Sequence, residues 1–208
     1  EAGLLLKRRF RLALLNPLLI ATVCVMAVLT LFKVEYRHYN EGAKYISYLL
    51  TPATVCLAVP LYQQLALLRK NLKAVAGGIT AGVLASLVSV FVLAKLFSLT
   101  HEQYVTLLPK SITTAIGMGV SEELGGISTI TVAVIIITGI LGNVIAESVC
   151  RIFRIEEPIA KGLALGTASH AIGTAKAMEL GEVEGAMSSL AIAGLMTVVG
   201  ASLFASLM

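Results

Sequence analysis

Residues Gly162–Gly185 read GLALGTASHAIGTAKAMELGEVEG, and this stretch decides the fold that the sequence predicts. Gly162, Gly166 and Gly173 would weaken a continuous lipid-facing helix. The charges of Lys176 and Glu179 would be costly in hydrocarbon, and the same stretch also holds Thr167, Ser169, His170 and Thr174. Irregular backbone at membrane depth is tolerated only where protein or a water-filled cavity covers it. We therefore predict a helix that is broken near the membrane midplane, as in secondary transporters that place polar backbone around a substrate.

The composition indicates an integral membrane protein. Of the 208 residues, 57% are hydrophobic and 13% are charged, and the mean hydropathy is +0.90, which is too apolar for a soluble domain. The net charge of +4 comes from short basic clusters between apolar runs, with no nucleic-acid-binding motif around them. We read these clusters as topology markers and expect no nucleic-acid partner.

The sequence shows no pattern typical of a catalytic site or a metal site. Cys24, Cys56 and Cys150 are widely spaced, and neither a disulfide framework nor a metal-binding pattern is present. All twelve acidic residues are Glu. Ser169 and His170 are adjacent, so on a helix they would point roughly 100° apart and could not form a nucleophile and base pair. We expect no enzyme activity, no cofactor and no metal.

The apolar runs predict a succession of membrane segments. Clean spans are expected over residues 12–32, 74–94, 125–146 and 185–208. A second broken helix is expected over residues 46–68, because Pro52 and Pro60 each remove a helix hydrogen bond. Residues 98–126 are too polar for a simple span and are expected to form a re-entrant hairpin that turns near residues 109–111.

An internal repeat relates the irregular segments. SITTAIG at Ser111–Gly117 matches TASHAIG at Thr167–Gly173, and a fainter copy ends at Pro60. The repeat makes Gly117 the counterpart of Gly173, and we expect helix breaks at Pro52, Pro60, Gly117, Gly166 and Gly173. The chain is thus predicted to be one transmembrane domain over residues 1–208, built from repeat 1 (about 1–97) and repeat 2 (about 98–208).

The basic clusters predict the orientation of the repeats. Ten of the sixteen Lys and Arg residues lie in three short connections, at residues 7–11, 69–73 and 151–161. If all three are cytoplasmic, the two repeats have opposite orientations. The predicted fold class is therefore an all-α membrane protein with two inverted repeats, broken helices that cross near the midplane, and about seven membrane segments.

Several motifs resemble the LrgB/CidB family of membrane proteins. They are PKSITTAIGMGVSEELGGI from Pro109, TGILG from Thr138, AKGLALGTASHAIGTAKAMELGEVEGAMSSLA from Ala160, NPLL from Asn16 and PATVCLAVPLYQQL from Pro52. The resemblance covers nearly the whole chain. Three positions depart from the family pattern: Ala115 stands where Pro is common, and Asn143 and Glu147 stand at positions that are usually apolar. Glu147 lies four residues before Arg151, so a helical ion pair is the simple expectation.

The resemblance implies two alternative functions in a bacterial cytoplasmic membrane. One is a carrier of small monocarboxylates such as glycolate, glycerate or pyruvate, as in a plastidial translocator that fuses an LrgB-like half to an LrgA-like half. The other is a partner of a small LrgA/CidA-like, holin-like membrane protein that modulates murein hydrolase activity and cell lysis. The resemblance also implies the crossed broken helices of the cation/anion antiporter group. Further expected partners are membrane lipid and a second copy of the chain in a dimer.

For a carrier, the candidate substrate site combines hydroxyl groups and two lysines. Lys110 and Lys176 would supply positive charge beside the N-termini of half-helices, where an anion is favoured. The expected substrate-binding residues are Lys110, Ser111, Thr113, Thr114, Thr167, Ser169, His170, Thr174 and Lys176.

Each of these residues also has a structural explanation. The lysines can extend along apolar surface to the interface, and Ser or Thr can return a hydrogen bond to the helix. His170 can be a pH-sensitive cavity residue or a packing residue. Glu123 and Glu179, at equivalent positions of the repeat, can coordinate a coupling cation or cap and solvate loop ends.

Overall fold

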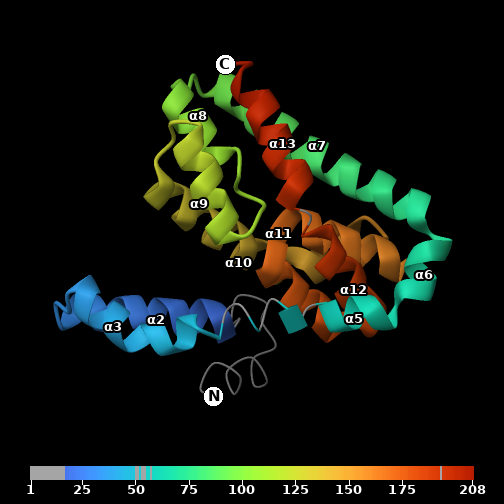
Figure 1. Cartoon of the computed structure of the whole chain (residues 1–208), viewed down its shortest axis with the longest axis horizontal. Coiled ribbons are helices and arrows are strands. Elements are labelled where there is room, and N and C mark those ends of the chain that lie inside the picture. Colours follow the sequence, from blue (N-terminus) through green and yellow to red (C-terminus); the bar gives the residue numbers. More distant parts are fainter. Residues whose placement is uncertain (1–16, 50–51, 53–54, 57, 193) are drawn as a thin grey trace. The chain divides into compact units, whose positions relative to one another are not determined.

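The computed structural model describes residues 17–49, 52, 55–56, 58–192 and 194–208, and every regular element in these ranges is an α-helix (Figure 1). The all-α prediction is therefore confirmed. The chain divides into two compact units, Glu1–Val59 and Pro60–Met208. This division does not fall at the predicted repeat boundary near residue 97, and the inverted repeats and seven segments stay predictions.

Among the described residues, the first unit contains two complete helices. Helix α2 (Pro17–Leu31) covers most of the predicted span 12–32, and α3 (Tyr36–Ser47) follows after a short polar connection. The basic cluster at residues 7–11 and the start of that span lie outside the described residues, as do residues 50, 51, 53, 54 and 57 of the predicted broken segment 46–68.

Two short helices follow along the chain: α5 (Ala58–Gln63), within which the boundary between the two units falls, and α6 (Leu65–Lys70) of the second unit. Pro60, predicted as a helix break, has helical geometry within α5. Within the described residues, helical geometry is interrupted at Gln64, between α5 and α6.

Two long apolar helices follow in this unit. Helices α7 (Leu72–Leu96) and α10 (Ser128–Ile152) have 25 residues each and are, among the described helices, the two that are individually long and apolar enough to cross a membrane. Each is about 37 Å long, which exceeds the roughly 30 Å hydrocarbon layer. The predicted spans 74–94 and 125–146 are thus confirmed.

Residues 101–123 form two short helices, α8 (His101–Leu107) and α9 (Thr114–Glu123). A capping box starts α8, in which Gln103 N–H donates to Thr100 Oγ1 and Thr100 N–H donates to Gln103 Oε1. The turn between the helices buries Leu108 and Ile112 completely. Neither helix has the length of a span, as expected for the predicted hairpin. Gly117, predicted as a break, lies inside α9, because the turn comes before this helix.

A buried hydroxyl cluster ties this hairpin to α10. Thr131 Oγ1 lies 2.7 Å from Ser121 Oγ and 2.9 Å from Thr106 O, and Thr106 Oγ1 accepts a hydrogen bond of 2.9 Å from Ile127 N–H. All three hydroxyl residues are buried. The cluster therefore fixes α8 and α9 against the start of α10 without a charged group.

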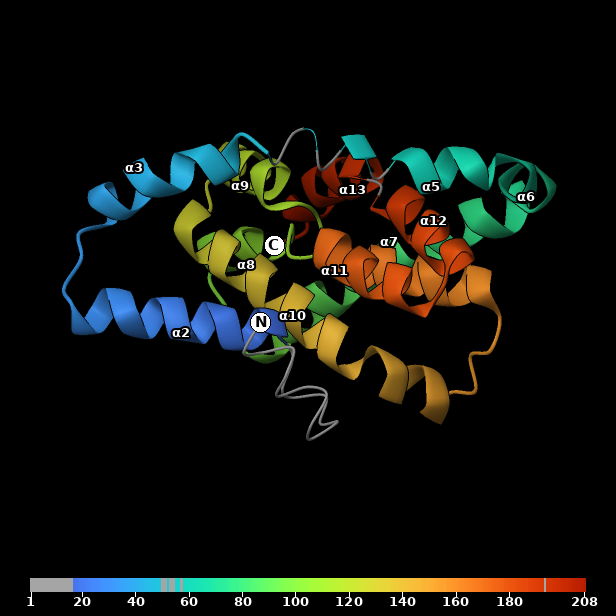
Figure 2. The ribbon, with the colours of Figure 1, turned by 90° about the horizontal axis from the view of Figure 1, so that it is seen from below.

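The C-terminal part holds α11 (Pro158–Leu180), α12 (Glu182–Ala191) and α13 (Gly194–Ala205). The span predicted over residues 185–208 is not a single helix: α12 and α13 are bent by 41° relative to each other. Helix α12 packs alongside α11 (Figures 1 and 2). A Cβ atom at Gly162 would lie 2.5 Å from Glu184 O, and one at Gly166 would collide with Ser188 O. These glycines therefore allow the backbones of the two helices to touch.

Candidate functional site

Helix α11 is interrupted at His170, whose φ of 44° and ψ of −138° are not helical. Gly166 and Gly173, which were predicted as breaks, have helical geometry on either side of it. Gly173 serves a different purpose, since a Cβ atom there would lie 2.6 Å from Leu165 O. Gly173 therefore leaves space for the backbone to bend back towards Leu165. The non-helical dihedral angles themselves belong to His170.

Helix α10 covers the interruption. His170 Nε2 lies 3.0 Å from Ile135 O, a contact that requires a hydrogen on Nε2, and Asn143 Nδ2 donates to Ile172 O at 3.1 Å. A Cβ atom at Gly139 would lie 2.8 Å from His170 Nε2, and one at Gly142 would collide with Ser169 Oγ. Helix α10 thus provides both the space and the hydrogen-bond partners that the bend in α11 needs.

Asn143 was not among the predicted site residues, although its position in an apolar helix and its departure from the family pattern were visible. Its partner, the carbonyl group of Ile172, could not be predicted, because that contact joins two helices.

Thr174 continues the polar contacts beyond the bend. Its Oγ1 donates to His170 O at 3.0 Å and lies 2.8 Å from Ser188 Oγ of α12, and both Thr174 and Ser188 are fully buried. Ser169, His170 and Thr174 therefore face α10 and α12, and none of them lines the larger cavity described below.

Lys176 is held by two carboxylates. Its Nζ lies 2.5 Å from Glu147 Oε1 of α10 and 3.2 Å from Glu179 Oε2 on its own helix. The lysine side chain is only 10% exposed, whereas the two glutamates are 54% and 56% exposed. Glu147 therefore pairs with Lys176, and the ion pair expected with Arg151 is not observed in this part of the chain. Glu123, the predicted counterpart of Glu179, is exposed at the end of α9.

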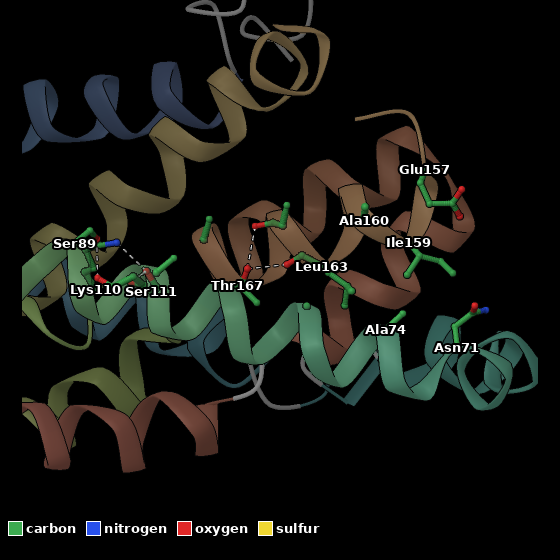
Figure 3. Close-up of a pocket in the computed structure, with 16 residues that line it drawn as sticks. Asn71, Ala74, Ser89, Lys110, Ser111, Glu157, Ile159, Ala160, Leu163 and Thr167 are labelled. Atoms are coloured by element: carbon green, nitrogen blue, oxygen red, sulfur yellow. Dashed lines mark hydrogen bonds between the residues drawn. The ribbon is translucent and has the colours of Figure 1, made fainter. Parts of the chain in front are cut away.

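The predicted residues Lys110, Ser111 and Thr167 line one cavity of about 680 Å³ between α7 and the first half of α11 (Figure 3). Helix α7 approaches α11 closely there, at two glycines of α7. A Cβ atom at Gly82 would lie 2.6 Å from Thr167 Oγ1, and one at Gly78 would lie 2.8 Å from Leu163 Cδ1. Thr113 and Thr114, at the start of α9, are half-buried and do not line it.

Hydroxyl groups and one cation gather at one end of this cavity. Lys110 Nζ donates to Ser111 Oγ at 3.0 Å, and Ser111 Oγ lies 3.0 Å from Ser86 Oγ of α7. Among the described residues, Lys110 forms no ion pair. Thr167 donates its hydroxyl hydrogen to Leu163 O at 2.8 Å, so its oxygen is available mainly as an acceptor. A carboxylate would find its strongest partner in Lys110.

The helices and this polar site within them define an integral membrane protein, and comparison with known proteins gives its family. The model of the LrgB-like family matches residues 1–207. The chain therefore belongs to the LrgB-like family.

Several curated relatives carry holin-like or antiholin-like names. The chain is 41% identical over 185 residues to "Holin-like protein CidB" of Staphylococcus aureus, covering 89% of this chain and 81% of that protein. It is 39% identical over 203 residues to "Antiholin-like protein LrgB" of Bacillus cereus, covering 97% of this chain and 88% of that protein. No solved structure matches the chain. These names agree with the second of the two expected functions rather than with the carrier.

Proposed function

We propose that this chain is a holin- or antiholin-like protein of the bacterial cytoplasmic membrane that acts with a small LrgA/CidA-type membrane protein on murein hydrolase activity and lysis. The names of relatives that match most of the chain carry this proposal. Many large apolar side chains on α7 and α10 are exposed, among them Val92, Ile137 and Leu141, and such surfaces suit association with lipid or with another membrane helix.

The test is a lysis assay in a bacterium that lacks its own LrgB-type gene. Expression of the chain together with an LrgA/CidA-type protein should change the rate of autolysis and the murein hydrolase activity on zymograms, relative to the partner alone. Equal autolysis and hydrolase activity with and without the chain would refute the proposal. Membrane fractions must show equal amounts of both proteins in each strain.

The cavity between α7 and α11 favours a second function, a carrier for small carboxylates. Lys110 and the hydroxyl groups of Ser86 and Ser111 offer a charge-assisted site at one end of a cavity whose volume lies in the range of small-molecule sites. A two- or three-carbon acid would fill only that end of it. Lys176, the other lysine expected to bind the substrate, is instead paired with glutamates.

Uptake into proteoliposomes separates the two functions. A carrier should take up labelled glycolate or pyruvate saturably and retain a trapped dye, whereas a lesion-forming protein should release the dye. Lys110→Met should weaken glycolate uptake at least tenfold, because a hydrogen bond to a charged group is worth about 1.5–3 kcal/mol. Lys95→Met is the matched control, since Lys95 lies in the last turn of α7 outside the cavity. Unchanged uptake in Lys110→Met would exclude the assigned site.

A further inference from the structure

A second, smaller cavity of about 360 Å³ lies where α10 ends and α11 begins. Its lining includes Arg151 from the last turn of α10, Arg154 from the connection and Lys161 from the start of α11. The acidic residues of the lining are Glu147 and Glu156. None of these residues lines the cavity between α7 and α11.

The three basic side chains are available to an external anion. In the described part of the chain, neither guanidinium group nor the Lys161 ammonium group has a carboxylate within 4.0 Å. Glu147, the nearer candidate on the helix, is engaged with Lys176 instead. The lining therefore carries three positive charges against two negative ones, and one of the two negative charges is already compensated. A phosphate group matches such a site because guanidinium groups bind its oxygens in a fork geometry.

The surroundings distinguish a lipid phosphate from a free one. Helix α10 is longer than the hydrocarbon layer is thick, so its last turn reaches the level of the headgroups. Directly beside Arg151 and Arg154, Ile152 and Phe153 are 73% and 72% exposed. Large apolar side chains next to unpaired cations suit a ligand with a phosphate headgroup and an acyl chain.

We propose that Arg151, Arg154 and Lys161 bind the phosphate group of an anionic phospholipid, whose acyl chain lies against Ile152 and Phe153. The site is independent of the proposed carrier function, since it shares no residue with the carboxylate cavity.

The experiment measures binding of fluorescent phosphatidylglycerol and phosphatidylcholine to the purified full chain in neutral detergent. The triple variant Arg151→Gln, Arg154→Asn, Lys161→Gln removes the three charges. Asparagine is chosen at position 154 because this residue has a φ of 52°, which asparagine tolerates. Each direct contact to the phosphate group should contribute about fivefold to the affinity, so the triple variant should bind phosphatidylglycerol about a hundredfold more weakly.

The matched control is the triple variant Arg69→Gln, Lys70→Gln, Lys73→Gln, which removes three charges from another basic cluster and should keep phosphatidylglycerol affinity within about threefold. Equal losses in both triple variants would mean general electrostatic attraction and would overturn the proposal. Equal binding of the two lipids would also overturn it. Displacement of the lipid by millimolar inorganic phosphate would assign the site to the free ion instead. If the triple variant does not fold in gel filtration, Arg151→Gln alone should still show the fivefold loss, and its absence would refute the site.

Discussion

Lys176 is a buried cation whose partners come from two helices. Glu147 belongs to α10, Glu179 lies one turn further along α11, and both carboxylates reach water while the lysine side chain does not. Loss of the lysine therefore leaves groups that water can hydrate. Loss of both glutamates leaves a charge that water reaches poorly, which is the costlier change.

We expect Glu147→Gln with Glu179→Gln to destabilise the protein far more than Lys176→Met. The double variant leaves Lys176 without a counter-charge, at a cost of about 3 kcal/mol, whereas Lys176→Met should cost about 1 kcal/mol or less. Thermal unfolding in detergent measures both. Lys176→Met introduced into the double variant should restore stability, and a further loss in that triple variant would contradict the ion-pair role.

At the scale of the element, α10 is the support on which α11 bends. The carbonyl groups of Ile135 and Ile172 and the spaces at Gly139 and Gly142 all serve the interruption at His170. The close fit means that even one added methyl group at these glycines must displace the bend.

Gly142→Ala should lower the free energy of unfolding by about 1–3 kcal/mol, because the new Cβ atom would collide with Ser169 Oγ. Adding Ser169→Gly should recover part of this loss by removing the colliding side chain. Gly77→Ala is the control: its Cβ atom meets nothing within 4 Å, so the exchange should be neutral or stabilising by up to about 1 kcal/mol. Equal effects of Gly142→Ala and Gly77→Ala in detergent unfolding would contradict the support role of α10.

Sequence patterns predicted the elements that depend on local composition. Uncharged runs predicted the bounds of α7 and α10 to within a few residues, except that α10 ends six residues beyond the predicted span. The polar residues around Pro109 predicted the turn before α9. The pattern placed the interruption of α11 at a glycine, whereas tertiary contacts with α10 stabilise it at His170. The bend between α12 and α13 was missed, because an uncharged run is equally consistent with one helix or two. Glu179 was visible three residues from Lys176, but Glu147 lies on another helix.

At the scale of the second unit, two basic clusters lie at one end. Asn71, between Arg69 and Lys73, and Glu157, between Arg151 and Lys161, line the same end of the larger cavity (Figure 3). This placement is what antiparallel spans α7 and α10 require if both clusters face the cytoplasm. The predicted re-entrant hairpin over residues 98–126 would then begin and end on the opposite side.

Single cysteines should report this topology in a background in which Cys24, Cys56 and Cys150 are replaced by Ser. Leu72→Cys and Phe153→Cys should both be protected from an impermeant thiol reagent in intact cells, and Phe97→Cys at the other end of α7 should react. All three positions are well exposed on the protein. Labelling at residue 153 without labelling at 72 would contradict the antiparallel arrangement.

The covered bend at His170 also bears on how the chain enters the membrane. The Ile172 carbonyl group accepts a hydrogen bond from α10, and lipid would offer no such donor. Five residues connect α10 to α11, so the ribosome delivers the two helices almost together and α10 first. We therefore expect the two helices to enter the bilayer as a pair, in which α10 covers the bend of the helix made immediately after it.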